Sequence, residues 1–137
     1  MNIFLDANIL VSVLNKEYPL FTYSSRLVSL ADNNRFKVFT TPISLAIAFY
    51  FSEKKSGRES AKENIRILTT KLQIASVDKT VTQKASSDKT ILDFEDGLEY
   101  YAAVQAGCKC IITEDVNDFH FSKVEVLDAH QFLEKYL

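Results

Sequence analysis

Short apolar segments alternate with segments of helical periodicity along the chain, and this alternation constrains the fold more than any other feature. The apolar segments have the length and composition of buried strands and cover residues 2–5, 37–40, 73–75, 109–113 and 124–126. Helical patterns occupy residues 9–14, 20–31, 43–54, 58–71, 78–87, 93–105 and 128–136. Strands that are connected through helices form parallel sheets with helices on both faces. We therefore predict an α/β fold and, from the length, a single domain over residues 1–137.

The composition excludes several classes of protein. A net charge of −2 and a pI near 5.7 give no support for a nucleic-acid binder or a membrane-surface protein, so any such case depends on local clusters. No segment approaches the roughly 20 apolar residues of a membrane span, and no signal peptide is recognisable. Cys108 and Cys110 lack partners for a zinc site. We expect buried free thiols in a reducing cytoplasm, and no contact with membranes.

Acidic residues lie where ligands bind in such folds, just beyond the carboxyl ends of the strands. Asp6 follows the first strand and stands between two apolar runs, where an unpaired carboxylate is costly to bury. Asp115 follows the strand at 109–113. At the start of the helix 93–105, Asp93 and Asp96 are three residues apart and share a face. Carboxylates that meet at one sheet edge stay ionised only when a cation neutralises them.

Oxygen ligands of this kind suit Mg²⁺ or Mn²⁺. Such an ion can activate water and offset charge on a phosphate, so the pattern favours metal-assisted phosphodiester hydrolysis. Some of these acids also have structural interpretations. Asp93 has the position of a helix N-cap, and Asp118 could cap a turn. Asp6 could cap the following helix, although Asn8 is nearer its expected start. Glu95 and Glu99 fall on another helix face, where we expect them to be solvated.

Three stretches resemble the characteristic motifs of PIN domains, the small α/β nucleases that include the VapC toxins of bacterial toxin–antitoxin pairs. They are MNIFLDAN at 1–8, DFEDGLEYYAA at 93–103 and IITEDVNDF at 111–119. The resemblance implies a three-layer α/β/α fold with a parallel sheet of about five strands, and a ribonuclease that uses Mg²⁺ or Mn²⁺. It also implies an RNA substrate, an antitoxin protein as partner and a homodimer.

The same resemblance assigns roles to individual residues. It makes Asp6, Asp96 and Asp115 metal-binding acids with a catalytic role, and it adds Asp118 as a further acid of the site. It places the following residues in or near the pocket: Asn8, Asp93 and Thr113.

One departure from the PIN pattern concerns the helix at 43–54. PIN nucleases usually carry a glutamate there, but positions 46–48 hold no acid, and Glu53 lies about two turns further on. Ser44 could contribute a hydroxyl. The departure leaves open a degenerate PIN domain that only binds RNA or a protein partner. A metal-dependent phosphatase of another acidic α/β family is a third alternative.

Basic and aromatic residues outside these motifs suggest contact surfaces. Basic residues at helical spacing form a stripe if one helix runs through them, and they are Lys55, Arg58, Lys62 and Arg66. This stripe could contact RNA phosphates, or it could be a solvated face paired with Glu59 and Glu63. The aromatic run at 49–51 covers most of a helix circumference, so part of it is available for a subunit interface.

Overall fold

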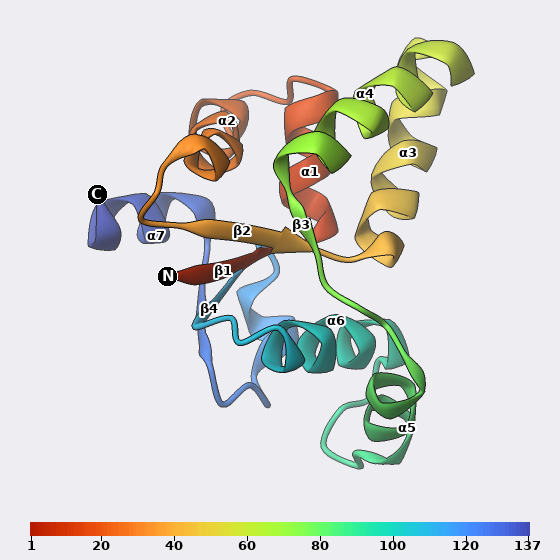
Figure 1. Cartoon of the computed structure of the whole chain (residues 1–137), viewed down its shortest axis with the longest axis vertical. Helices are drawn as coiled ribbons and strands as arrows, with labels where there is room; N and C mark the ends of the chain where they lie inside the picture. The colour runs from red at the N-terminus through yellow and green to blue at the C-terminus, as the bar shows by residue number, and fades with distance from the viewer.

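A five-stranded parallel sheet forms the centre of the molecule in the computed structural model, which describes all residues 1–137 (Figure 1). The strand order is β3-β2-β1-β4-β5, and each neighbouring pair is parallel. The strands are β1 (Asn2–Leu5), β2 (Lys37–Thr40), β3 (Gln73–Ile74), β4 (Cys110–Ile112) and β5 (Glu125–Leu127). The predicted α/β fold with a parallel sheet is therefore confirmed.

Helices cover both faces of this sheet. They are α1 (Ala7–Leu14), α2 (Phe21–Ser29), α3 (Pro42–Ser56), α4 (Arg58–Lys71), α5 (Lys79–Ser87), α6 (Phe94–Gln105) and α7 (Ala129–Tyr136). Short 3₁₀ helices lie at Leu30–Asp32 and Val116–Phe119. Figure 1 shows α1 to α4 on one side of the sheet and α5 and α6 on the other. None of the helices is both long and apolar enough to span a membrane.

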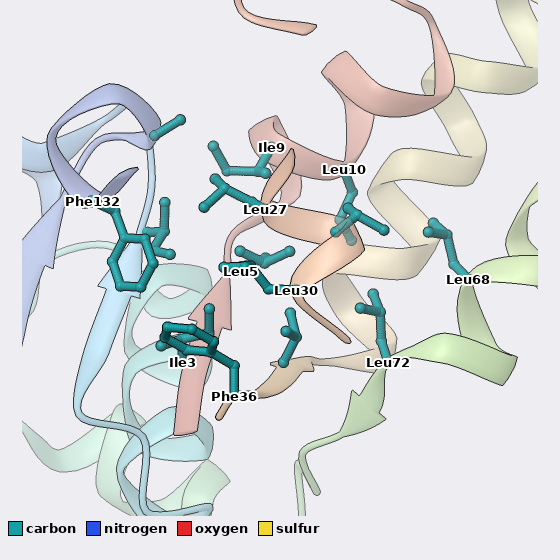
Figure 2. Close-up of a cluster of buried hydrophobic side chains, with 14 of the residues drawn as sticks. Ile3, Leu5, Ile9, Leu10, Leu27, Leu30, Phe36, Leu68, Leu72 and Phe132 are labelled. Carbon is teal, nitrogen blue, oxygen red and sulfur yellow. The ribbon is translucent and has the colours of Figure 1, made fainter. Parts of the chain in front are cut away.

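Alternating side chains of the central strand β1 pack into the core on each face of the sheet. Ile3 and Leu5 point into the larger core, where they pack with residues of α1, α2 and α7 (Figure 2). Phe4 points to the opposite face and packs against α6. This alternation is the period of two that a strand imposes on its side chains. Residues 3–5 are buried on both faces of the sheet and are accordingly all apolar, whereas Asn2 at the start of β1 is half-buried. Cys108 and Cys110 are buried and free, as predicted.

The strand order reverses between β1 and β4. The chain proceeds from β1 through β2 to β3 on one side of β1, and then returns to place β4 and β5 on the other side. In open sheets of this kind, ligands bind beyond the carboxyl ends of the strands at the point where the order reverses. Asp6 immediately follows β1 and therefore lies at this switch point.

Candidate metal centre

Asp6 is held in place from both of its carboxylate oxygens. Its backbone N–H donates to the carbonyl of Ile112 at 3.0 Å and so continues the pairing of β1 with β4. Oδ1 accepts from the backbone N–H of Ala7 at 2.8 Å, which makes Asp6 the N-cap of α1. Oδ2 accepts from Oγ1 of Thr113 at 2.8 Å. The expectation that Asn8 is better placed to cap this helix is wrong, because α1 begins at Ala7.

Thr113 connects the residues that follow β1 and β4. Its side chain is fully buried, and besides donating to Asp6 its Oγ1 accepts from Nδ2 of Asn8 and from the backbone N–H of Asp115, both at 3.1 Å. Asn8 Nδ2 also lies 3.2 Å from Oδ2 of Asp115, and Asn8 Oδ1 accepts from the backbone N–H of Glu114 at 3.2 Å. The structure thus joins Asp6, Asn8, Thr113 and Asp115 in one hydrogen-bonded network.

Asp96 enters the same region from the first turn of α6. Asp93 caps this helix by accepting from the backbone N–H of Asp96 at 3.0 Å. The prediction that Asp93 is a helix N-cap is therefore confirmed. Burial raises the pKa of Asp96 to about 7, and the negative charges of nearby carboxylates add to this rise. These carboxylates belong to Asp93, Asp6, Asp118 and Glu95. Asp118 is exposed in the 3₁₀ helix Val116–Phe119, and no hydrogen bond or ion pair joins its side chain to the other acids.

The acids of this site have no basic partner. Burial raises the pKa of Asp6 above its ordinary value, the hydrogen bonds from Thr113 and Ala7 oppose the rise, and the charge of Asp115 adds to it. None of the ion pairs in the structure involves Asp6, Asp96, Asp115 or Asp118. The negative charge at this edge of the sheet is therefore not neutralised by the protein itself.

Glu99 is a buried acid near this edge of the sheet that the sequence analysis did not place there. It is only 2% exposed, so the expectation that it is solvated is wrong. Its Oε1 accepts from Oγ1 of Thr41 at 2.6 Å, and its Oε2 accepts from Oγ of Ser44 at 2.5 Å. A signal was available, because Glu99 follows Asp96 by three residues and such residues share a helix face.

Ser44 and Thr41 place Glu99 at the start of α3. Thr41 follows β2 and caps α3 by accepting from the backbone N–H of Ser44 at 3.1 Å. Pro42 occupies the first turn, where a missing N–H has no cost. The predicted pocket residue Ser44 is fully buried and reaches the acidic region through its bond to Glu99.

The donor set at this edge fits a hard divalent cation. It consists of carboxylate, hydroxyl and amide oxygens, without histidine or thiolate, and it carries uncompensated negative charge. No group of three or more His, Cys, Asp and Glu side chains is arranged to hold a metal ion in this structure. Mg²⁺ sites typically use one or two carboxylates and complete the shell with water, so this chemistry does not require a preformed cage of acids.

The condition for the predicted basic stripe, one helix running through all four residues, is not met. Gly57, with φ of 87°, separates α3 from α4, so Lys55 lies on a different helix from the remaining residues and bonds to the carbonyl of Asn15. The other three residues are exposed, but of the predicted pairs only that of Arg66 with Glu63 is present, and neither Lys62 nor Glu59 forms an ion pair. Arg58 pairs with Glu53 at 3.1 Å, and Arg66 pairs with Glu63 at 2.6 Å.

The aromatic clusters divide between interior and surface. Tyr100 is buried, and its hydroxyl accepts from the backbone N–H of Lys123 at 3.2 Å. Tyr50 and Phe51 on α3 are 51% and 45% exposed. These two side chains remain candidates for a homodimer interface, which stays a prediction.

Comparison with known proteins agrees with this fold. The family model described as the PIN domain matches residues 2–117. The chain therefore belongs to the PIN domain family, as its motifs predicted. It is 28% identical over 138 residues to Ribonuclease VapC1 of Aquifex aeolicus (strain VF5), covering 98% of this chain and 94% of that protein.

Two solved structures share the fold. VapBC-1 from nontypeable Haemophilus influenzae matches with a TM-score of 0.73 at 17% identity, covering 95% of this chain and 99% of that one. VapC20 from Mycobacterium tuberculosis, a toxin that cleaves the sarcin-ricin loop, matches with a TM-score of 0.63 at 17% identity, covering 80% and 86%. At these identities the structural matches establish the fold alone.

Proposed function

We propose that this PIN domain is a divalent-metal-dependent endoribonuclease of the VapC type and the toxin of a toxin–antitoxin pair. The observation that carries the proposal is Asp6, which lies at the switch point of the sheet beside other carboxylates that no basic side chain neutralises. The similarity to Ribonuclease VapC1 over nearly the whole chain supports RNA as the substrate.

Some residues of the site bind the cation, and others orient the residues that bind it. Asp6, Asp96 and Asp115 hold the cation, Mg²⁺ or Mn²⁺, and Asp118 assists through direct or water-mediated contact. When bound, the cation supplies a means of activating water and of offsetting negative charge on the scissile phosphate. Thr113 orients Asp6 by donating to its Oδ2. Asn8, at 3.2 Å from Oδ2 of Asp115, fixes that carboxylate relative to α1.

The proposed partners follow from the same class of protein. A toxin of this kind is paired with an antitoxin protein, and the fold match to VapBC-1 supports such a partner. We expect a homodimer, with the exposed aromatic side chains of α3 as the candidate interface. RNA phosphates would approach the acidic edge only with the cation present, since like charges repel.

Incubation of the purified protein with RNA and Mn²⁺ tests this function. Asp6→Asn is the sharpest control, because asparagine is also a favourable N-cap and should preserve the start of α1. We expect cleavage by the wild-type protein and a loss of roughly 100-fold or more in Asp6→Asn, since the carboxylate at the switch point is gone. Cleavage at the wild-type rate by Asp6→Asn would contradict the proposal.

A degenerate PIN domain that binds RNA or a protein partner without cleaving is the second candidate. The first turn of α3 contains no acid, and positions 46–48 contain none either. RNA retention without cleavage, at every Mn²⁺ concentration tested, would favour this candidate. Cleavage of a small phosphoester but not of RNA would instead favour a phosphatase.

A further inference from the structure

Glu99 is the only carboxylate among the buried side chains of the protein. Burying an ionised carboxylate is costly unless an opposite charge or several donors compensate. No lysine, arginine or histidine forms an ion pair with Glu99. Its only hydrogen-bond partners in the structure are the hydroxyls of Thr41 and Ser44. The folded protein thus maintains a buried acid without a charged partner.

The hydroxyl contacts bring this acid to the sheet edge beside Asp6. Phe4 pairs with Phe39 in the parallel register of β1 and β2, and continuing that register by two residues sets Asp6 beside Thr41. Glu99 bonds to Thr41 at 2.6 Å, so its carboxylate lies on the β2 side of Asp6. The charge of Asp6 is among the causes that raise the pKa of Glu99, behind the larger effect of burial, which indicates that the two groups are near each other.

The carboxylate of Glu99 retains capacity for a further ligand. Two carboxylate oxygens offer about four lone-pair sites, and each oxygen of Glu99 accepts one hydroxyl bond. Carboxylates that ligate metals are themselves held by hydrogen bonds from neighbouring groups. Thr41 and Ser44 satisfy this requirement because both are buried and fixed at the first turn of α3.

We propose that Glu99 supplies the carboxylate that α3 lacks at positions 46–48 and binds the same divalent cation as Asp6, directly or through one water. Thr41 and Ser44 are positioning residues that hold Glu99 toward Asp6. The inference rests on the proposed function insofar as that function places a cation at Asp6. It adds an acid from α6 on the β2 side of the site, opposite the network of Thr113.

Calorimetric titration with Mn²⁺ tests this role without any activity readout. Glu99→Gln preserves the size of the side chain and an oxygen acceptor but removes the charge. We expect Mn²⁺ affinity to fall by about 10- to 100-fold. Glu95→Gln is the matched control, because it removes the same charge from an exposed position on the same helix. It should alter the affinity by less than about threefold, as expected for a solvated charge.

The outcomes separate this inference from the proposed function. Wild-type affinity in Glu99→Gln, together with lost binding in Asp6→Asn, would overturn the inference and leave the function intact. Equal losses in Glu99→Gln and Glu95→Gln would also overturn it, because only general charge would then matter. Absence of Mn²⁺ binding in the wild-type protein would contradict the proposed function itself.

A second measurement does not depend on the folding of any variant. The wild-type protein is labelled with ¹³C in its side-chain carboxyl groups, and substoichiometric Mn²⁺ is added. The paramagnetic ion broadens the resonance of each carboxyl group, and the broadening increases steeply as the distance between that group and the ion decreases. We expect the Glu99 resonance to broaden together with that of Asp6 and more strongly than that of Glu95. Broadening of Asp6 with Glu99 less affected than Glu95 would refute a role for Glu99 at the cation.

Discussion

Two polar corners flank Asp6 at the carboxyl edge of the sheet, and they are built differently. We call Asn8, Thr113 and Asp115 the β4 corner, and Thr41, Ser44 and Glu99 the β2 corner. The β4 corner is held by Thr113, and its acid Asp115 is exposed. The β2 corner is closed, and its acid is only 2% exposed.

This difference shows two ways of presenting a carboxylate to a cation. In the β4 corner, Thr113 and Asp115 follow β4 and Asn8 lies in the first turn of α1 after β1, so the ends of two neighbouring strands position them. The β2 corner depends on contact between two helices, because Glu99 of α6 must reach hydroxyls at the start of α3. An exposed acid is screened by water, whereas a buried one retains strong electrostatic interactions. We therefore expect the β2 corner to contribute more to the pH dependence of stability than the β4 corner does.

The largest expected effect is on stability as a function of pH in the metal-free protein. Burial raises the pKa of Glu99 from 4.5 to about 7, so the folded state holds this proton more tightly than the unfolded state does. Its stabilising contribution is complete below pH 4.5 and is lost as the pH rises to 7. The rise in pKa corresponds to roughly 3 kcal/mol. Urea denaturation between pH 4.5 and 8, with a chelator present, measures this loss.

Glu99→Gln provides the control for this experiment, because glutamine does not titrate. Asp6 and Asp96 also have raised pKa values, and their titration lowers stability in the same direction. The slope of the free energy of unfolding against pH is therefore compared between the wild-type protein and the variant, and the difference is the contribution of Glu99. The free energy of unfolding should depend less steeply on pH in the variant. Parallel slopes would show that Glu99 titrates as an ordinary carboxyl and that the β2 corner is not electrostatically distinct.

A smaller effect is expected from Thr113→Val in the β4 corner. The substitution leaves Oδ2 of Asp6 and the backbone N–H of Asp115 without their bonds to Oγ1. Unpaired buried polar groups cost about 1–3 kcal/mol, and urea denaturation at pH 7 should show a loss of that size. Thr41→Val probes the β2 corner in the same way. If Thr113→Val costs less than about 0.5 kcal/mol, the hydroxyl does not organise the β4 corner.

The smallest effect is expected from Asp118→Asn. Asp118 is exposed and acts on the site through Asp96 rather than through a hydrogen bond to it. We expect a loss of Mn²⁺ affinity of about threefold, in keeping with the weakness of exposed charges. Calorimetry measures it, with Glu134→Gln on α7 as a control for net charge. An unchanged affinity would remove Asp118 from the site.

The two corners also differ in how far the sequence predicted them. Asp6, Thr113 and Asp115 directly follow apolar strands, and parallel strands end at one edge of a sheet, so the β4 corner follows from local pattern. Asp96 was found because it lies in the first turn of a helix with a recognisable cap. The parallel sheet was predictable for the same reason, since short apolar segments alternate with helices throughout.

Glu99 and the basic residues required knowledge of tertiary structure. Whether Glu99 faces water or α3 depends on how α6 packs, and helix periodicity alone does not determine this. The four basic residues do not lie on one helix, because Gly57 adopts a positive φ that ends α3 and redirects the chain. In both cases the deciding contact lies between elements whose relative placement the local sequence does not specify.

The location of bound Mn²⁺ in crystals of the wild-type protein tests the central claim most directly. Anomalous scattering at the manganese edge should show a peak at the switch point, about 2.0–2.3 Å from a carboxylate oxygen of Asp6. The carboxylates of Asp96, Asp115 and Glu99 should surround it, as ligands or through single waters. A protein saturated with Mn²⁺ whose only peak lies away from Asp6 would contradict the account.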